Sequence, residues 1–358
     1  EAPREEGRYE LGQVLPEIRD ALDALRSAIG ELATAMHDSA DAGIDIEKLH
    51  DQLVHINERL ALLCSEDSWD GLRWLEVNPR GLRLNLTPLD VSATLRSMIN
   101  NDHQAWIFTS ATLAVGDDFS HFTSRMGLGD ATALTFPSPY AVADKGLVWL
   151  PEDLPMPSDP EHTARMLEAV TPLLEFTSGG MFCLFTSHRA LKAANKWFRA
   201  NKKALAGRKL LVQGSAPRDD LLRRFRAAGN AVLLGTSSFR EGVDVRGTAL
   251  TIVAIDKLPF ASPADPLLMA RLEYIRRNGG NGFTEHQVPQ AVLAMKQGAG
   301  RLLRDDSDYG VIVLCDRRIT EKGYGKTFLR SFEPMPSTSS IEDVRAFFER
   351  HEAAGAVA

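Results

Sequence analysis

Two amphipathic helices are predicted near the start of the chain, because apolar side chains recur at three- and four-residue steps between residues 11 and 64. The first stripe comprises Leu11, Leu15, Ile18, Leu22, Leu25, Ile29 and Leu32, and the second comprises Ile46, Leu49, Leu53, Ile56, Leu60 and Leu63. A break at Ala42–Gly43 separates them, which predicts a helical hairpin. Such a hairpin needs a partner surface, and no other segment is an obvious match.

From about residue 72 the pattern changes to short apolar runs that alternate with helical stretches. The runs are residues 106–109, 147–150, 181–185, 209–212, 231–234, 250–255 and 311–314, and the candidate helices include 188–200, 217–227 and 287–304. Continuous apolar strands separated by helices are typical of an α/β fold with a parallel sheet covered on both faces. Ligands of such sheets lie at the carboxyl ends of the strands, so function is expected in the residues that follow each strand.

The composition is that of an ordinary globular protein, with 44% hydrophobic and 25% charged residues and no run of eighteen apolar residues. Cys64, Cys183 and Cys315 are far apart and form no Cys-x-x-Cys pair. This spacing argues against a disulfide framework and a metal site, and it favours the reducing cytoplasm. The first ten residues are too acidic for a signal peptide and lack an initiator methionine, so we expect a piece of a longer protein.

The net charge of −7 is unevenly distributed. Residues 1–76 carry eighteen acidic and seven basic side chains, whereas residues 187–230 carry twelve Lys or Arg against Asp219 and Asp220. Because phosphate binding depends on the local field, residues 187–230 are a candidate nucleic-acid surface. Ordinary solvated helix faces would show the same charges.

The strongest chemical signal is the sequence QGAGRLLR at residues 297–304. On a continuous helix Gln297, Arg301 and Arg304 would fall within about 60° of one another, and two guanidiniums on one face suit a polyphosphate. The opposite, buried side would comprise Val292, Met295, Ala299, Leu302 and Leu303. Gly298 and Gly300 weaken a helix by about 1 kcal/mol each, so the close approach of a ligand or another backbone is expected there.

A second signal follows the apolar run 231–234, where the chain reads GTSSFREGVD from Gly235 to Asp244. Small hydroxyl residues and their backbone N–H groups at the end of a strand make a phosphate-binding turn. Glu241 and Asp244 could hold a ribose hydroxyl or order a water molecule near a nucleotide.

Hydroxyl residues also follow two other apolar runs, in TSATL at residues 109–113 and in LFTSH at residues 184–188. A Gly-Lys-Thr sequence at residues 325–327 resembles the end of a phosphate loop. The full Walker pattern would require glycine at position 320, which is Thr320. The sequence contains no other candidate for that loop and no DEAD- or DEAH-like box.

These segments, in this order, resemble motifs III to VI of superfamily 2 helicases, and more closely the DinG and YoaA branch of bacterial helicases related to XPD. The matches are motif III at 109–113, motif IV at 184–188, motif V at 235–245 and motif VI at 297–304. Residues 256–260 and 315–326 also look like DinG-type sequence, so the resemblance covers roughly residues 77–335.

In the family that the chain resembles, two RecA-like domains clamp ATP between them. The resemblance implies four regions: the helical hairpin of an Arch-like domain at 1–76, the returning end of helicase domain 1 at 77–135, a RecA-like helicase domain 2 at 136–335, and a tail at 336–358. The tail is predicted to carry a short helix near Ser340–His351.

The resemblance also assigns roles to residues. Arg301 and Arg304 would be arginine fingers that neutralise charge on the γ-phosphate, and Gln297 would contact that phosphate or its attacking water. The expected nucleotide-binding residues are Glu241, Gly242, Asp244 and Gly300. The expected nucleic-acid-binding residues are Thr236, Ser238, Ser187 and His188, and the expected coupling residues are Thr109, Ser110 and Thr112.

The implied activity of the parent protein is ATP-dependent 5′→3′ DNA unwinding, with ATP and Mg²⁺ as cofactors and a 4Fe–4S cluster outside this sequence. The implied partners are single-stranded DNA, the missing helicase domain 1 and the chi subunit of the replicative polymerase. Because motifs I, Ia and II are absent from the sequence, this chain alone is expected not to hydrolyse ATP. Two alternatives remain: a non-enzymatic module that binds chi, and a P-loop kinase that uses Lys326.

Overall fold

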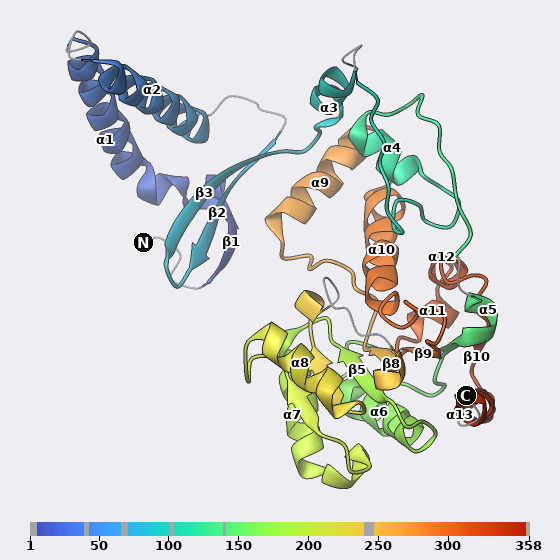
Figure 1. Ribbon diagram of the computed structural model, residues 1–358. Coiled ribbons are helices and arrows are strands. Elements are labelled where there is room, and N and C mark those ends of the chain that lie inside the picture. Colours follow the sequence, from blue (N-terminus) through green and yellow to red (C-terminus); the bar gives the residue numbers. More distant parts are fainter. Residues whose placement is uncertain are drawn as a thin grey trace. The chain divides into compact units, whose positions relative to one another are not determined.

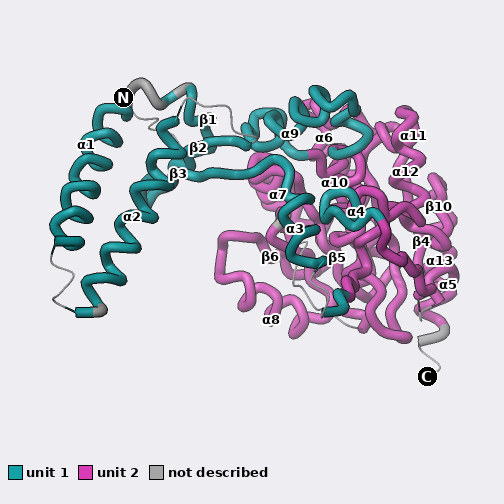
Figure 2. Tube along the Cα trace, turned by 90° about the horizontal axis from the view of Figure 1, so that it is seen from above, with its two compact units in different colours: residues 1–106, 123–129, 261–286 teal, residues 107–122, 130–260, 287–358 magenta. Residues whose placement is uncertain are grey.

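A computed structural model describes residues 6–38, 43–65, 71–100, 104–138, 141–239 and 247–355. The chain divides into two compact units, which Figure 2 shows in different colours. Unit 1 comprises residues 1–106, 123–129 and 261–286, and unit 2 comprises residues 107–122, 130–260 and 287–358.

Unit 1 contains the predicted helical hairpin, formed by α1 (Leu11–His37) and α2 (Ile44–Cys64). It also contains an antiparallel three-stranded sheet that was not predicted. The strands are β1 (Gly7–Glu10), β2 (Gly71–Asn78) and β3 (Gly81–Pro88), in the order β1-β2-β3. The remaining helices are α3 (Ser92–Ile99), α9 (Pro266–Arg277) and most of α4 (Ser120–Met126), and residues 283–287 form a π-helical turn.

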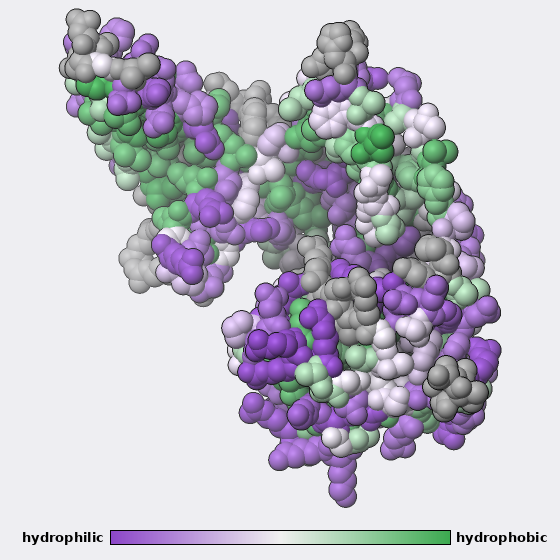
Figure 3. Space-filling view, viewed as in Figure 1, coloured by the Kyte–Doolittle hydropathy of each residue, from purple (hydrophilic) through white to green (hydrophobic). Residues whose placement is uncertain are grey.

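The three-stranded sheet supplies part of the partner surface that the hairpin requires. Leu11, Leu63 and Leu75 are buried together where α1 and α2 meet β2. Farther along the hairpin, large apolar side chains remain between 46% and 48% exposed, namely Leu25, Leu32, Leu49 and Ile56. Figure 3 shows this apolar surface along the hairpin.

Unit 2 is built on the predicted parallel sheet, which has seven strands in the order β10-β4-β9-β8-β5-β7-β6. The strands are β4 (Gly146–Trp149), β5 (Gly180–Leu184), β6 (Leu210–Val212), β7 (Val232–Gly235), β8 (Leu250–Ile255), β9 (Gly310–Leu314) and β10 (Ser337–Thr338). Six of these correspond to the apolar runs of the sequence, which confirms the α/β fold class.

The seventh run, residues 106–109, is not a strand, and that prediction was wrong. Trp106 is 50% exposed and Ile107 is 85% exposed. An apolar run becomes a strand only where a neighbouring strand pairs with it, and no described residue pairs with this one.

Helices cover both faces of the sheet (Figure 1). One face packs on α6 (His162–Val170), α7 (His188–Ala200) and α13 (Ile341–Gly355), and the other packs on α8 (Arg218–Ala228), α10 (Val288–Ala299) and α12 (Gly325–Arg330). Along β5, Met181 and Cys183 face the first layer, while Phe182 and Leu184 face the second. Strands buried on both faces explain the non-alternating apolar runs.

Short elements complete unit 2. They are α5 (Val142–Lys145), α11 (Arg318–Glu321) and 3₁₀ turns at Thr171–Glu175, Lys202–Leu205, Ser237–Phe239 and Gly247–Ala249. Among the helices that the structure describes, none combines the length and apolar character required to span a membrane.

The end of the chain is integrated into unit 2. β10 pairs with β4, and Val344, Phe347 and Phe348 of α13 are buried in the core. Ser340 Oγ accepts the Asp343 N–H at 3.4 Å, as expected of the predicted N-cap.

Candidate functional site

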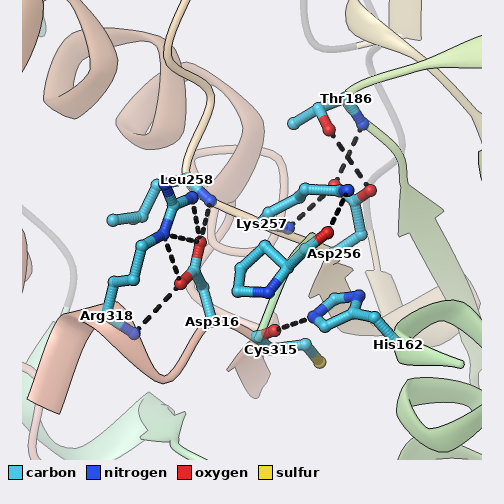
Figure 4. Close-up of polar contacts among 9 residues, drawn as sticks. His162, Thr186, Asp256, Lys257, Leu258, Cys315, Asp316 and Arg318 are labelled. Carbon is cyan, nitrogen blue, oxygen red and sulfur yellow. Dashed lines mark hydrogen bonds and ion pairs between the residues drawn. The ribbon is translucent and has the colours of Figure 1, made fainter. Parts of the chain in front are cut away.

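The carboxyl ends of β5 and β8 are joined by the buried side chain of Asp256 (Figure 4). Its carboxylate accepts the backbone N–H of Thr186 at 2.9 Å and that of Lys257 at 2.8 Å, and the Thr186 hydroxyl donates to it at 3.3 Å. The LFTSH segment is therefore fixed to the residues that follow β8.

Asp316 makes the corresponding connection between β8 and β9. It accepts the Leu258 N–H at 2.8 Å, and Arg318 donates to it from Nε and Nη2 at distances between 2.6 and 3.1 Å. Residues 257–260 are thus held from both sides. Sequence reasoning assigned no role to Asp256 or Asp316; the available signal was an aspartate one or two residues after an apolar strand.

Burial controls the titration of this cluster. It raises the pKa of Asp256 to about 7, although the Lys257 charge and the hydrogen bonds from Thr186 and Lys257 oppose the shift. Burial also lowers the pKa of His162, whose Nε2 lies 2.9 Å from the Cys315 carbonyl oxygen. His162 Nδ1 is buried and has no hydrogen-bond partner among the described residues.

Two predicted nucleic-acid-binding residues lie at the start of α7, beside this cluster. Ser187 is the N-cap of α7, and its side chain accepts the Ala190 N–H at 3.2 Å. His188 is the first residue of α7 and is exposed. The Ser187 hydroxyl thus caps the start of α7, while the His188 side chain is accessible.

The other two predicted nucleic-acid-binding residues follow β7. Thr236 is buried, and its N–H and hydroxyl donate to Gln213 Oε1 at 2.7 and 3.0 Å, whereas Ser238 is exposed. Gln213, which follows β6, escaped sequence reasoning because it belongs to no recognised motif. The predicted nucleotide-binding residues Glu241, Gly242 and Asp244 lie outside the described residues.

The predicted coupling residues form a local hydroxyl turn in unit 2. Ser110 Oγ lies 3.1 Å from Thr112 Oγ1 and accepts the Thr112 N–H at 3.1 Å. Thr109 and Ser110 are exposed and Thr112 is half-buried. The hydrogen bonds hold this turn without defining a contact to a nucleotide or to DNA.

The continuous helix expected through Arg304 is not observed, and this correction changes the geometry of the arginines. α10 ends at Ala299, and Gly300 has a ψ of 7°, so Arg301 and Arg304 lie in the turn that follows. Gln297 remains in the last turn of the helix. The single helical stripe proposed for Gln297, Arg301 and Arg304 was therefore wrong, although all three side chains are half-buried.

Asp308 gives the physical reason for the early end of the helix. In a continuing helix the Arg304 N–H would donate to the Gly300 carbonyl, but it donates instead to Asp308 Oδ2 at 2.7 Å. The Asp305 N–H donates to the same oxygen at 2.8 Å. Two glycines already weaken this end of α10, so the carboxylate competes successfully for the backbone.

Asp308 also links the arginine-bearing turn to a residue that follows the second sequence signal. Its Oδ1 accepts the Gly247 N–H at 2.7 Å, and Gly247 lies three residues after Asp244. Gly247 precedes β8 and Asp308 precedes β9, so this meeting point is at the amino ends of the strands. LFTSH therefore lies at the carboxyl ends of the strands, where functional residues were expected, whereas the arginine-bearing turn lies near the amino ends.

The Gly-Lys-Thr sequence at residues 325–327 has a packing explanation. Gly325 is buried, and a Cβ there would collide with the Ile319 carbonyl oxygen, so the glycine allows α12 to approach α11. Lys326 is exposed on α12. The contact argues against the kinase alternative because the glycine is required by the fold itself.

The cysteines do not fit an iron–sulfur cluster. Burial raises the pKa of Cys183 to about 12 and that of Cys315 well above its ordinary value, so both remain neutral thiols in the core of unit 2. Cys64 belongs to unit 1. Among the residues described, no group of three or more His, Cys, Asp or Glu side chains is arranged to hold a metal ion.

Residues 170–335 match the family model described as a helicase C-terminal domain. The chain is 44% identical over 268 residues to the ATP-dependent DNA helicase YoaA of Escherichia coli K12, covering 75% of this chain and 42% of that protein. It is 36% identical over 332 residues to YoaA of Haemophilus influenzae, covering 93% of this chain and 51% of that protein. The chain thus spans about half the length of these relatives.

The fold resembles that of a solved helicase structure. A solved XPD helicase structure superimposes with a TM-score of 0.55 over 86% of this chain and 55% of that chain, at 15% sequence identity. The XPD-like architecture inferred from the motifs is therefore confirmed at the level of the fold.

Proposed function

Because this chain belongs to the DinG/YoaA-type, XPD-like helicases, we propose that it forms the second motor domain of an ATP-dependent DNA helicase. The proposal is carried by one observation: the turn that bears Arg301 and Arg304 is hydrogen-bonded through Asp308 to Gly247, three residues beyond the GTSSFREGVD segment. Gly247 and Asp308, which are 61 residues apart in sequence, meet at one edge of the sheet.

The chemistry of this edge suits the transfer of a phosphoryl group. The guanidiniums of Arg301 and Arg304 neutralise negative charge that develops on the γ-phosphate, while Gln297 contacts that phosphate or the attacking water. Glu241, Gly242 and Asp244 contact the nucleotide from the neighbouring loop, and Gly300 lets the nucleotide approach the backbone.

Binding ATP completely requires groups that this sequence does not contain. A phosphate loop and a carboxylate for Mg²⁺, contributed by helicase domain 1, hold the triphosphate against the arginines. Mg²⁺ supplies charge neutralisation between the β- and γ-phosphates when it is bound. A 4Fe–4S cluster, which this chain's cysteines do not fit, is likewise contributed by other residues of the protein.

DNA binds at the opposite edge, where the strands have their carboxyl ends. His188 and Ser238 are exposed there, and α7 extends the surface with four exposed basic side chains, Arg189, Lys192, Lys196 and Arg199. The helix contains no acidic residue, and no described residue forms an ion pair with these four. On α8, which covers the other face of the sheet, Arg223 and Arg224 in contrast both pair with Asp220.

Uncompensated charge at helical spacing on α7 supports a contact with a phosphate backbone. The strand is single-stranded DNA, translocated in the 5′→3′ direction. The hydroxyl turn at Thr109, Ser110 and Thr112 transmits the nucleotide state to this grip.

The test is the Arg304→Ala substitution in the helicase that carries this chain together with its phosphate loop. DNA-stimulated ATP hydrolysis should fall by about 10³-fold or more, because an arginine finger acts mainly in the transition state. The affinity for ATP should change by less than about tenfold. Hydrolysis is measured by phosphate release and affinity by titration with a fluorescent nucleotide.

Arg330→Ala is the control, because Arg330 is exposed at the end of α12 and belongs to none of the four helicase-like motifs. It should leave hydrolysis unchanged. Retention of normal DNA-stimulated turnover by the Arg304→Ala protein would show that the arginine-bearing turn does not serve ATP hydrolysis.

A further inference from the structure

Asp308 has an arrangement that packing alone does not explain. Its side chain is 2% exposed, and its carboxylate accepts three backbone N–H groups, from Gly247, Arg304 and Asp305, at 2.7 to 2.8 Å. A buried carboxylate is retained only where donors compensate for lost water. Of these donors, Arg304 belongs to the arginine-bearing turn, Asp305 follows it directly, and Gly247 lies three residues after Asp244.

The two carboxylate oxygens of Asp308 accept N–H groups from different segments. Oδ1 serves Gly247, and Oδ2 serves Arg304 and Asp305. Gly247 has a φ of +74°, a left-handed conformation that favours glycine, although a Cβ there would meet nothing within 4 Å. The glycine at this position is therefore required by the backbone path into the hydrogen bond rather than by a lack of space.

We propose that Asp308 is a positioning residue for ATP hydrolysis. It fixes the backbone of Arg304 relative to Gly247, the first residue of the 3₁₀ turn before β8, so that a displacement of either is transferred to the other. This inference rests on the proposed function of Arg301 and Arg304, and it adds a residue that touches neither ATP nor DNA.

A purely structural carboxylate is the competing explanation, since Asp308 also closes a turn through its own N–H, which donates to the Asp305 carbonyl at 3.1 Å. The two explanations differ in what a substitution does to the folded enzyme. A structural residue changes the fraction of enzyme that is folded, whereas a positioning residue changes the turnover of each folded molecule.

The Asp308→Asn substitution separates them in the whole helicase. Asparagine keeps the shape but has one acceptor oxygen, so it cannot serve Gly247 on one side and Arg304 on the other. Per folded molecule, kcat for DNA-stimulated ATP hydrolysis should fall about 10- to 100-fold, because a small misplacement of a catalytic group has an effect of this size. The KM for ATP should stay within about threefold.

A double-mutant cycle shows whether Asp308 acts through Arg304. When Arg304 is already alanine, adding Asp308→Asn should lower kcat by less than a further twofold, since there is no longer a guanidinium to position. Losses that multiply, or a kcat unaffected by Asp308→Asn, would overturn the inference. If Arg304→Ala itself leaves turnover intact, both the proposed function and this inference fail; if only Asp308→Asn is silent, this inference fails alone.

Glu352→Gln is a matched control. Glu352 is also a carboxylate that joins separate segments, since it accepts the Ser178 N–H at 2.9 Å and the Tyr309 hydroxyl at 2.8 Å, but it lies on α13. It should lower the melting temperature and leave kcat per folded molecule unchanged. An equal loss of kcat in this variant would assign the effect to general destabilisation and overturn the inference.

A measurement on the unmodified helicase decides the question if Asp308→Asn does not fold. Amide hydrogen exchange is followed with and without a non-hydrolysable ATP analogue and single-stranded DNA. Residues 247–249 and 302–308 should become protected together, because one carboxylate binds both. Protection of only one of these segments would contradict the proposed connection.

Discussion

At the residue scale, unit 2 is connected by carboxylates that accept backbone N–H groups from segments distant in sequence. Asp256 and Asp316 connect the carboxyl ends of the strands, while Asp308 and Glu352 connect segments near the amino ends. Hydrogen bonds to charged groups are stronger than neutral ones, and those inside a protein are less exposed to competing water. Short loops can thus be fixed without a large apolar contact of their own.

Asp256 should make the stability of unit 2 depend on pH. Its pKa is raised to about 7 in the folded protein from an ordinary value near 3.8, so between pH 4 and pH 7 the folded protein binds a proton that the unfolded chain has lost. The stability that Asp256 contributes is present in full below pH 4, falls as pH rises to about 7, and is constant above that. The loss has an upper bound of roughly 4 kcal/mol.

Asp256→Asn removes this titration with little change of shape. Urea unfolding at pH 5, 6, 7 and 8 should show a free energy of unfolding that declines less with pH in the variant than in the unmodified chain. Asp305→Asn, at an exposed position, is the control and should keep the decline. Parallel pH profiles for Asp256→Asn and the unmodified chain would disprove the assignment.

Sequence reasoning found the residues of this site unevenly, for a physical reason. Ser187 could be located because a small polar residue directly after an apolar strand is a local signal. Asp308 and Gln213 could not, because their importance comes from partners 61 and 23 residues away in the chain, Gly247 and Thr236. Hydrogen bonds between distant segments leave no periodic pattern in the sequence.

At the element scale, α10 shows how a helical pattern can continue past the end of a helix. Leu302 is buried and extends the apolar spacing of α10, although it lies in the turn after Ala299. Leu302 packs against the start of β9, where a Cβ on Gly310 would lie 2.6 Å from Leu302 Cδ1. The apolar position is thus satisfied by the sheet rather than by helical continuation, which the pattern alone cannot distinguish.

Helix α13 should contribute strongly to the stability of unit 2. Phe348 is fully buried, so Phe348→Ala should lower the free energy of unfolding by about 3–5 kcal/mol, measured by urea denaturation. Glu349→Ala, at the exposed neighbouring position, should change it by less than about 0.5 kcal/mol. Equal effects of the two substitutions would mean that α13 does not pack on the core.

This packing also affects how a partner contact through residues 336–358 should be tested. Deleting the segment would expose the apolar side chains beneath α13, so a loss of chi-subunit binding would not identify a contact. Substitutions on the exposed face of α13, at Glu342, Arg345 and Glu349, keep the core and test the contact itself.

The basic face of α7 should contact phosphates, and that of α8 should not. Two double substitutions each remove two positive charges from one helix: Lys192→Gln with Lys196→Gln from α7, and Arg223→Gln with Arg224→Gln from α8. Binding of fluorescent single-stranded DNA to this chain is measured by anisotropy from 50 to 300 mM salt. The α7 pair should reduce the slope of log affinity against log salt by about 1.4, and the α8 pair by much less, because the slope counts phosphate contacts.

The same slope for both pairs would mean that binding depends on net charge alone. If only the α8 pair reduced the slope, DNA would contact α8 rather than α7. The basic residues of α7 would then no longer support the proposed DNA edge. Duplex DNA of equal length serves as a second probe, with a steeper expected dependence of about 0.9 per phosphate contact.

At the scale of the whole molecule, the sequence predicted unit 2 far better than unit 1. Strands buried on both faces produce unbroken apolar runs, which are conspicuous, as in residues 250–255. The three-stranded sheet of unit 1 has a weaker pattern, with Leu82, Leu84 and Leu86 alternating along β3. This alternation covers only three apolar residues, so it is a weaker signal than the long helical stripes of α1 and α2.

The edges to which we assign ATP and DNA lie at opposite ends of the strands of unit 2. The strands of unit 2 separate the arginine-bearing turn from His188, and a six-residue strand such as β8 is roughly 20 Å long. In the motor that we propose, bound ATP and bound DNA therefore do not contact each other, and the protein itself has to carry the effect of hydrolysis over that distance. Variants that bind ATP and DNA normally but do not translocate should therefore carry substitutions between the two edges.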